Sequence, residues 1–94
     1  MRIRYRTEAL ADLAKIRAFI HLSNPRAARR VLAEIRARID RLTLFPEKYR
    51  AGPVEGTREL VIAKYGYIVT YRAEPGVVTI LSVFHAAQNI PRGG

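Results

Sequence analysis

The stretch Gly56–Arg72, GTRELVIAKYGYIVTYR, decides the fold of this chain of 94 residues. It contains two runs that are rich in β-branched and aromatic side chains, Glu59–Ala63 and Tyr67–Arg72. Such runs are typical of strands. Only a short turn separates them, so the stretch predicts two consecutive strands that lie side by side.

A third strand is predicted on the C-terminal side, at Val77–Phe84. The segment Ala73–Gly76 joins it to the second strand, and its Pro75-Gly76 pair is what the central positions of a type II turn require. In the run VVTILSVF, apolar residues occur among the side chains that would point to either face of the strand. This pattern favours a central strand with both of its faces covered.

On the N-terminal side, Arg2–Tyr5 alternates charged and apolar residues and predicts a short strand. We expect a first helix with Thr7 as its N-cap, and a second with Asn24 as N-cap and Pro25 as its first residue. Apolar residues recur at helical spacing in both: Leu10, Leu13, Ile16, Phe19 and Ile20 in the first, and Ala28, Val31, Leu32, Ile35, Ile39 and Leu42 in the second. Residues 46–57 contain two prolines and two glycines and predict a loop.

These segments predict an α+β fold with an N-terminal strand, a helical hairpin and then a three-stranded antiparallel meander. The helices are expected to pack on one face of the sheet, because their apolar stripes need a surface that covers them. We expect residues 1–94 to form a single domain, with a flexible tail at residues 86–94.

Basic side chains are concentrated in the first half of the chain. There are 17 Lys and Arg against 8 Asp and Glu, a formal net charge of +9. Residues 1–50 hold 13 basic and 5 acidic side chains, whereas residues 51–94 hold 4 and 3. An acidic partner is therefore expected, either nucleic acid or an acidic protein segment. A basic surface that only aids solubility is the alternative.

The composition also excludes several classes of protein. The absence of cysteine excludes disulfides, thiolate zinc sites and a cysteine nucleophile, and it suits a cytoplasmic location. No apolar run approaches about 18 residues, so we expect no membrane span, and the N-terminus predicts no signal peptide. No phosphate-binding, zinc-binding or serine-hydrolase motif occurs, so we expect neither a cofactor nor a metal.

Two residues are candidates for acid–base chemistry on RNA. His85 follows the last predicted strand, and an imidazole titrates near neutral pH. Arg58 opens the first strand of Gly56–Arg72, where a cation is placed to hold developing phosphate charge, and Arg72 is a second such cation. A structural alternative stays open for both candidates. His85 is then a hydrogen-bonded structural group, and Arg58 forms an ion pair with Glu59 or Glu55.

Six short motifs occur in a specific order along the chain. They are A-x-x-D-L at Ala9–Leu13, N-P-x-A-A at Asn24–Ala28, F-P at Phe45–Pro46, G-T-R-E-L at Gly56–Leu60, Y-I-V-x-Y-R at Tyr67–Arg72 and H-x-A-Q-x-x-P at His85–Pro91. In order and spacing they resemble the RelE/ParE superfamily of toxins from type II toxin–antitoxin modules, and most of all its ParE branch. The resemblance implies a small α+β toxin that a cognate antitoxin holds inactive.

The resemblance also implies how the antitoxin binds. Antitoxins of this superfamily wrap an acidic, partly disordered C-terminal segment around the toxin, so a hetero-oligomer is expected. Acidic residues of such a segment would match the basic half of this chain. We expect the segment to contact Arg29, Arg36, Arg58 and Arg72.

Two targets are implied by the superfamily. ParE-type toxins inhibit DNA gyrase, whereas RelE-type toxins cleave messenger RNA in the ribosome. Arg58 matches an arginine that binds the scissile phosphate in the ribonucleases, and His85 lies near their catalytic region, so these two are the expected catalytic residues of the ribonuclease alternative. Ser82, however, stands where many of the ribonucleases have an arginine, and the closing AAQNIP lacks their general acid. Gyrase inhibition is therefore favoured, and an inactive module that only binds antitoxin and acts in autoregulation is a further alternative.

Overall fold

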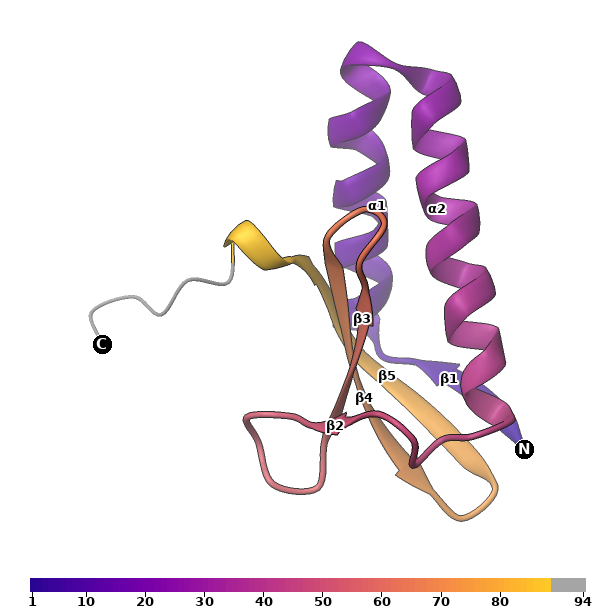
Figure 1. The fold of residues 1–94 in the computed structure, drawn as a ribbon. Helices are drawn as coiled ribbons and strands as arrows, with labels where there is room; N and C mark the ends of the chain where they lie inside the picture. The colour runs from indigo at the N-terminus through magenta and orange to yellow at the C-terminus, as the bar shows by residue number, and fades with distance from the viewer. Residues whose placement is uncertain (89–94) are drawn as a thin grey trace.

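The computed structural model describes residues 1–88. Its elements, in chain order, are β1 (Arg2–Tyr5), α1 (Thr7–Ser23), α2 (Pro25–Asp40), the 3-10 helix η1 (Arg41–Thr43), β2 (Arg50–Ala51), β3 (Arg58–Ile62), β4 (Tyr67–Glu74), β5 (Val77–His85) and the 3-10 helix η2 (Ala86–Gln88). Figure 1 shows α1 and α2 as a hairpin beside a twisted sheet, and the hairpin extends beyond the upper end of the sheet. The α+β class predicted from the sequence is confirmed.

The five strands form one sheet in the order β1-β5-β4-β3-β2. Strands β3, β4 and β5 form the predicted antiparallel meander, and β1 pairs with β5 in the parallel direction. The sequence does not predict β2, because Arg50–Ala51 lies in the segment interpreted as a loop. Two residues are too short to show an alternation, and this strand exists only through its pairing with β3.

The start of the second helix and the last turn are both predicted correctly from local signals. The Asn24 Oδ1 accepts a hydrogen bond from the Ala27 N–H at 2.9 Å, and Pro25 is the first helical residue, so both parts of that prediction are confirmed. Gly76 has a φ of +77°, as the third residue of a type II turn requires.

The predicted N-cap of the first helix is wrong by one residue. Thr7 is the first helical residue, and Arg6 is the N-cap, without a side-chain capping bond. The physical reason is that the Arg6 N–H still donates to the Ile80 carbonyl, at 3.0 Å, as the continuation of β1. The helix therefore begins directly after this bond.

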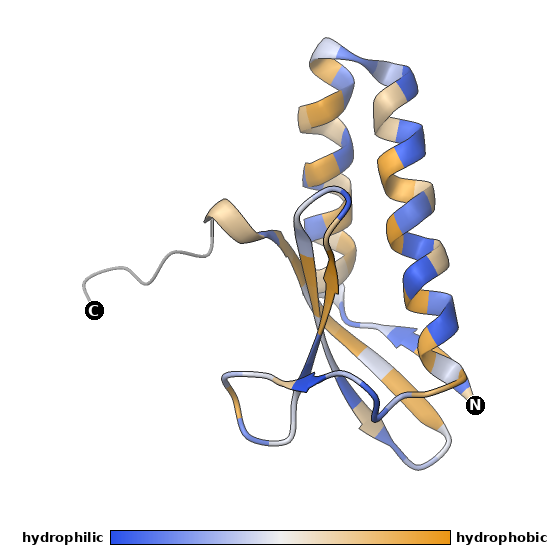
Figure 2. Cartoon of the chain, in the orientation of Figure 1, coloured by the Kyte–Doolittle hydropathy of each residue, from blue (hydrophilic) through white to orange (hydrophobic). Residues whose placement is uncertain are grey.

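The core lies between the helices and one face of the sheet, which we call the inner face. All six predicted apolar positions of α2 and η1 are buried, with Ile35 and Ile39 fully so. The stripe predicted for α1 is only partly buried, because Leu10 is 48% and Phe19 is 76% exposed. Helix α1 instead packs through Ala9, Leu13 and the half-buried Ile16 and Ile20. Figure 2 shows the corresponding mixture of hydrophobic and hydrophilic residues along both helices and the mainly hydrophobic central strands.

Within residues 1–88, no helix covers the opposite face of the sheet, which we call the outer face. In β5 the inner-face residues Val78, Ile80 and Val83 are buried, whereas Leu81 and Phe84 are only partly buried. The prediction that both faces of this strand are covered is therefore wrong. The helical hairpin covers only one face of the sheet. The apolar pattern of β5 does not distinguish a strand with one covered face from a strand with two.

Only part of the predicted tail at residues 86–94 lies in the described range, where Ala86–Gln88 forms η2. The rest lies outside the described residues, so its flexibility stays a prediction. Within residues 1–88, no helix is long and apolar enough to cross a membrane.

Candidate functional site

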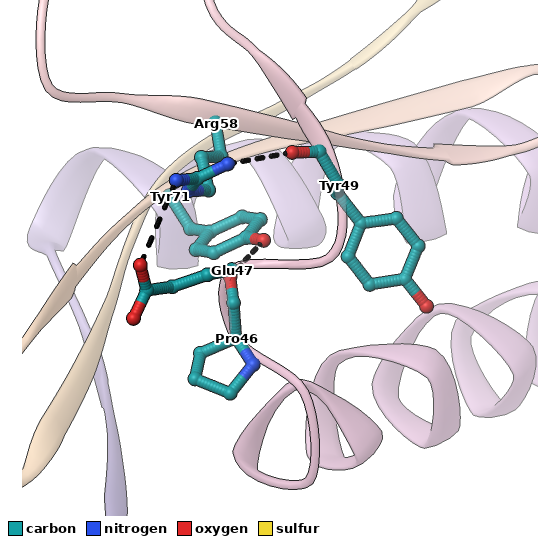
Figure 3. Close-up of polar contacts among 5 residues, drawn as sticks. All are labelled: Pro46, Glu47, Tyr49, Arg58 and Tyr71. Atoms are coloured by element: carbon teal, nitrogen blue, oxygen red, sulfur yellow. Dashed lines mark hydrogen bonds and ion pairs between the residues drawn. The ribbon is translucent and has the colours of Figure 1, made fainter.

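Arg58, the residue that opens β3, is bound to the preceding loop. Its Nη1 donates a hydrogen bond to the Tyr49 carbonyl at 2.9 Å, and its Nη2 lies 3.9 Å from the Glu47 Oε1 (Figure 3). The ion-pair partner is therefore Glu47, and the expected pairing with Glu59 or Glu55 is wrong. A third of the Arg58 side chain remains exposed.

Tyr71, directly opposite Arg58 on β4, binds the same loop. The Tyr71 ring is fully buried, and its hydroxyl donates to the Pro46 carbonyl at 2.6 Å (Figure 3). Burial raises the pKa of Tyr71 to about 12, against a smaller lowering by the Arg58 charge. Arg58 and Tyr71 thus hold residues 46–49 against the end of the sheet through two backbone carbonyls.

The two residues before Arg58 have structural roles as well. Gly56 has a φ of +83°, and a Cβ on it would lie 2.6 Å from the Arg72 Nη1, so the absence of a side chain lets this guanidinium lie against the loop. Thr57 is buried, and its hydroxyl donates to the Val54 carbonyl at 2.5 Å. The G-T-R motif therefore stabilises the loop that precedes it.

His85 lies at the far end of β5, on the inner face. Its ring meets the Tyr67 ring edge-on with centroids 5.1 Å apart, and its Nδ1 accepts a hydrogen bond from the Ala87 N–H at 3.1 Å. The proton of the neutral ring is therefore on Nε2, close to Gly66. A mainly apolar groove of about 470 Å³ adjoins the ring, lined by Lys15, Ile16, Phe19, Tyr67 and His85.

The two expected catalytic residues do not come together. Arg58 is opposite Tyr71 on β4, whereas His85 is opposite Tyr67. These two β4 positions are four residues apart, about 13 Å along a strand, and the side chains come from strands on either side of β4. Arg58 and His85 therefore lie at opposite ends of the inner face.

The outer face carries a row of polar residues that crosses four strands. In register these are Arg50, Glu59, Thr70 and Ser82. The Arg50 Nε and Nη2 each lie 2.9 Å from the Glu59 Oε1, and the Thr70 and Ser82 hydroxyls are hydrogen-bonded to each other. Sequence reasoning missed this row, because it depends on the register of strands that include the unpredicted β2. Its one local signal was the acidic Glu59, which directly precedes the apolar run Leu60–Ile62 of β3.

The remaining predicted antitoxin contacts lie elsewhere. Arg29 and Arg36 are exposed on α2, and Arg36 also lies over the Tyr5 ring at 5.8 Å from its centroid. Arg72 is half-buried against Gly56 on the other side of the sheet. A groove of about 220 Å³ between the helices is lined by Leu10, Leu13, Ala14, Arg17, Leu32 and Arg36. Among residues 1–88, no cluster of three or more metal-binding side chains occurs.

Comparisons with known proteins agree with this fold and sequence. A family model described as the ParE toxin of type II toxin–antitoxin systems, parDE, matches residues 3–90. The chain is 43% identical over 91 residues to the protein named "Putative toxin Y4kP" of Sinorhizobium fredii, covering 97% of this chain and 94% of that protein. It is 36% identical over 80 residues to toxin RelE2 of Caulobacter vibrioides, covering 85% and 89%.

Solved structures show the same fold at lower sequence identity. A chain of the chromosomal ParDE system from P. aeruginosa has a TM-score of 0.83 at 20% identity, covering 90% of this chain and 95% of that one. A chain of the intact E. coli RelBE toxin–antitoxin complex has a TM-score of 0.67 at 15% identity, covering 89% and 94%. From the family match and the 43% identical relative, we conclude that this chain is a toxin of a type II toxin–antitoxin system and belongs to the ParE toxin family of the RelE/ParE superfamily.

Proposed function

We propose that this toxin inhibits DNA gyrase by binding to it, and that it does not cleave messenger RNA. The observation that carries the proposal is the separation of Arg58 from His85. Acid–base cleavage of RNA needs the proton-transferring group and the charge-stabilising cation at one phosphate, each within hydrogen-bond reach. Two side chains at opposite ends of a sheet face do not meet this requirement.

The charges of residues 51–88, which contain β3, β4 and β5, support the same proposal. Residues 51–88 contain three basic and three acidic side chains, so this part of the toxin offers few cations to a phosphate backbone. Arg58 already binds the Tyr49 carbonyl. Ser82, which stands where the resemblance implies an arginine in many ribonucleases, instead bonds to Thr70, the neighbour of Glu59. A carboxylate in this row disfavours a phosphate there.

We further propose that a cognate antitoxin neutralises the toxin through an acidic C-terminal segment. The groove between α1 and α2 combines apolar Leu10 and Leu32 with the cations Arg17 and Arg36. An amphipathic acidic segment matches both features. Arg29 on α2 and Arg72 on the sheet remain proposed contacts. Arg58 is the weakest of the four, because its Nη1 is already engaged with the Tyr49 carbonyl.

Induction of the chain in cells without antitoxin tests the proposal. We expect growth arrest with filamentation and DNA damage, and primer extension on abundant messages should show no new 5′ ends. Message cleavage that disappears in Arg58→Ala or His85→Ala would instead support the ribonuclease alternative. Soluble expression without any growth defect would support an inactive antitoxin-binding module.

A further inference from the structure

The outer face contains a small pocket that the proposed function does not use. Its volume is about 280 Å³, and its floor is the row formed by Glu59, Thr70 and Ser82. The apolar residues Pro53, Val54, Leu81 and Phe84 line its sides. Small-molecule sites in proteins typically measure about 300–1,000 Å³, so this pocket suits a single side chain better than a nucleotide.

The carboxylate of Glu59 is the main charged group of this pocket. Its side chain is only 10% exposed. Both Arg50 nitrogens contact one oxygen, Oε1, and within residues 1–88 no hydrogen bond uses Oε2. A carboxylate accepts hydrogen bonds at both of its oxygens, so Glu59 retains the capacity to accept from a second donor.

The local charge favours a cationic donor. The Arg50 side chain is 60% exposed, so solvent screens its charge, whereas the Glu59 side chain is only 10% exposed. The Thr70 and Ser82 hydroxyls add further acceptors on the floor. The apolar sides suit the aliphatic stem of a long basic side chain, which packs against apolar surface while its head is bound.

We propose that this pocket binds an arginine side chain presented by the protein on which the toxin acts. The proposal rests on the proposed function, because it requires a protein target. The guanidinium bonds to the Glu59 Oε2 and the floor hydroxyls, and the stem lies along Leu81 and Phe84. An acidic antitoxin segment is not the occupant, because its carboxylates would be repelled by the Glu59 carboxylate. Arginine is among the residues that contribute most to protein interfaces.

The pocket is tested by NMR on the full chain with N-acetyl-arginine amide as the probe. N-acetyl-citrulline amide is the matched control, since it has nearly the same shape but no charge. We expect shifts centred on the amides of Glu59, Thr70 and Ser82, with the citrulline probe at least about tenfold weaker. Equal binding of the two probes, shifts spread over the surface, or no shifts at all would overturn the proposal.

Variants of the chain locate the binding. Glu59→Gln should lose the arginine response, whereas Glu55→Gln, an exposed change in the neighbouring loop, should keep it. If Glu59→Gln does not fold, Ser82→Leu decides, because it fills the pocket without touching the Arg50–Glu59 pair. An unchanged response in Ser82→Leu would overturn the proposal.

The gyrase assay then separates this inference from the proposed function. If the wild-type chain inhibits gyrase, Ser82→Leu should need about ten times more protein for the same inhibition, and Glu55→Gln should not. Equal inhibition by Ser82→Leu would overturn the pocket's role at the target. If the wild-type chain does not inhibit gyrase, the proposed function fails, while the probe titration still decides whether the pocket binds arginine.

Discussion

The Asp12 carboxylate on α1 accepts a hydrogen bond from the Val83 N–H on β5, at 2.9 Å. Strand β1 pairs with β5 only as far as Ile80, so in the described part of the chain the rest of that edge has no neighbouring strand. Helix α1 covers the edge, and Asp12 satisfies the exposed donor. Unpaired strand edges favour unwanted pairing with other chains, so this contact also protects the edge of β5 against such pairing.

The first prediction concerns Asp12. Asp12→Ala should lower the free energy of unfolding by about 1–3 kcal/mol, because it leaves the Val83 N–H without its acceptor. Asp12→Asn should cost less, since its amide oxygen still accepts a bond. Urea denaturation measures both, with the exposed Glu55→Ala as control. Equal stability of Asp12→Ala and the control would show that the contact contributes nothing.

The second prediction compares two glycines. Gly76→Ala should cost about 1–2 kcal/mol, because its φ is +77° and nothing lies within 4 Å of a new Cβ. Gly56→Ala should cost slightly more, since its Cβ would also lie 2.6 Å from the Arg72 Nη1 and this flexible side chain would have to move. Adding Arg72→Ala to Gly56→Ala should remove that excess. Thermal unfolding tests this, and identical losses for the two single variants would refute the close approach of Arg72.

The third prediction addresses Arg58. Arg58→Ala should destabilise the chain by about 1–3 kcal/mol, because it breaks a charge-assisted bond to the Tyr49 carbonyl. Arg29→Ala on the exposed surface of α2 should change stability by less than about 0.5 kcal/mol. Thermal melts compare the two variants. If Arg58→Ala melts like wild type and loses only its toxicity, Arg58 is a contact residue rather than a structural one.

The fourth prediction is a pH dependence at Tyr71. Its pKa is raised from 10.0 to about 12 by burial, so the unfolded chain loses this proton before the folded chain does. The contribution of Tyr71 to stability is therefore complete below pH 10 and falls as the pH rises from 10 to 12. Tyr71→Phe should be less stable at pH 8, since it lacks the bond to the Pro46 carbonyl, and should show a smaller loss between pH 10 and 12. Urea titrations across this range measure the difference, and parallel losses in both proteins would contradict it.

Local patterns predicted those elements whose signals lie close together in the sequence. The α2 stripe, including Ile35, and the Asn24-Pro25 helix start are examples, because periodicity and capping depend on neighbouring residues. The α1 stripe was predicted less well, since Leu10 and Phe19 follow the helical spacing but remain 48% and 76% exposed. The parallel pairing of β1 with β5 joins the two ends of the fold, and no local pattern encodes it.

The candidate site was less predictable for a related reason. The partner of Arg58 is the backbone carbonyl of Tyr49, and a backbone group has no sequence signature. The separation of Arg58 from His85 follows only from strand register, which a single sequence does not specify. The departure at Ser82 from the arginine that the resemblance implies was already visible in the sequence. In the structure Ser82 bonds to Thr70, which lies between Ser82 and Glu59 in the sheet.

The most direct test of gyrase inhibition is a supercoiling assay with purified gyrase, relaxed plasmid and increasing amounts of the purified chain. We expect a dose-dependent loss of supercoiling with accumulation of cleaved plasmid, and His85→Ala should inhibit as strongly as wild type. An unchanged rate of supercoiling in the presence of excess toxin would contradict gyrase inhibition. The contradiction would be clearest if the same preparation cleaves ribosome-bound messenger RNA and the His85→Ala variant does not.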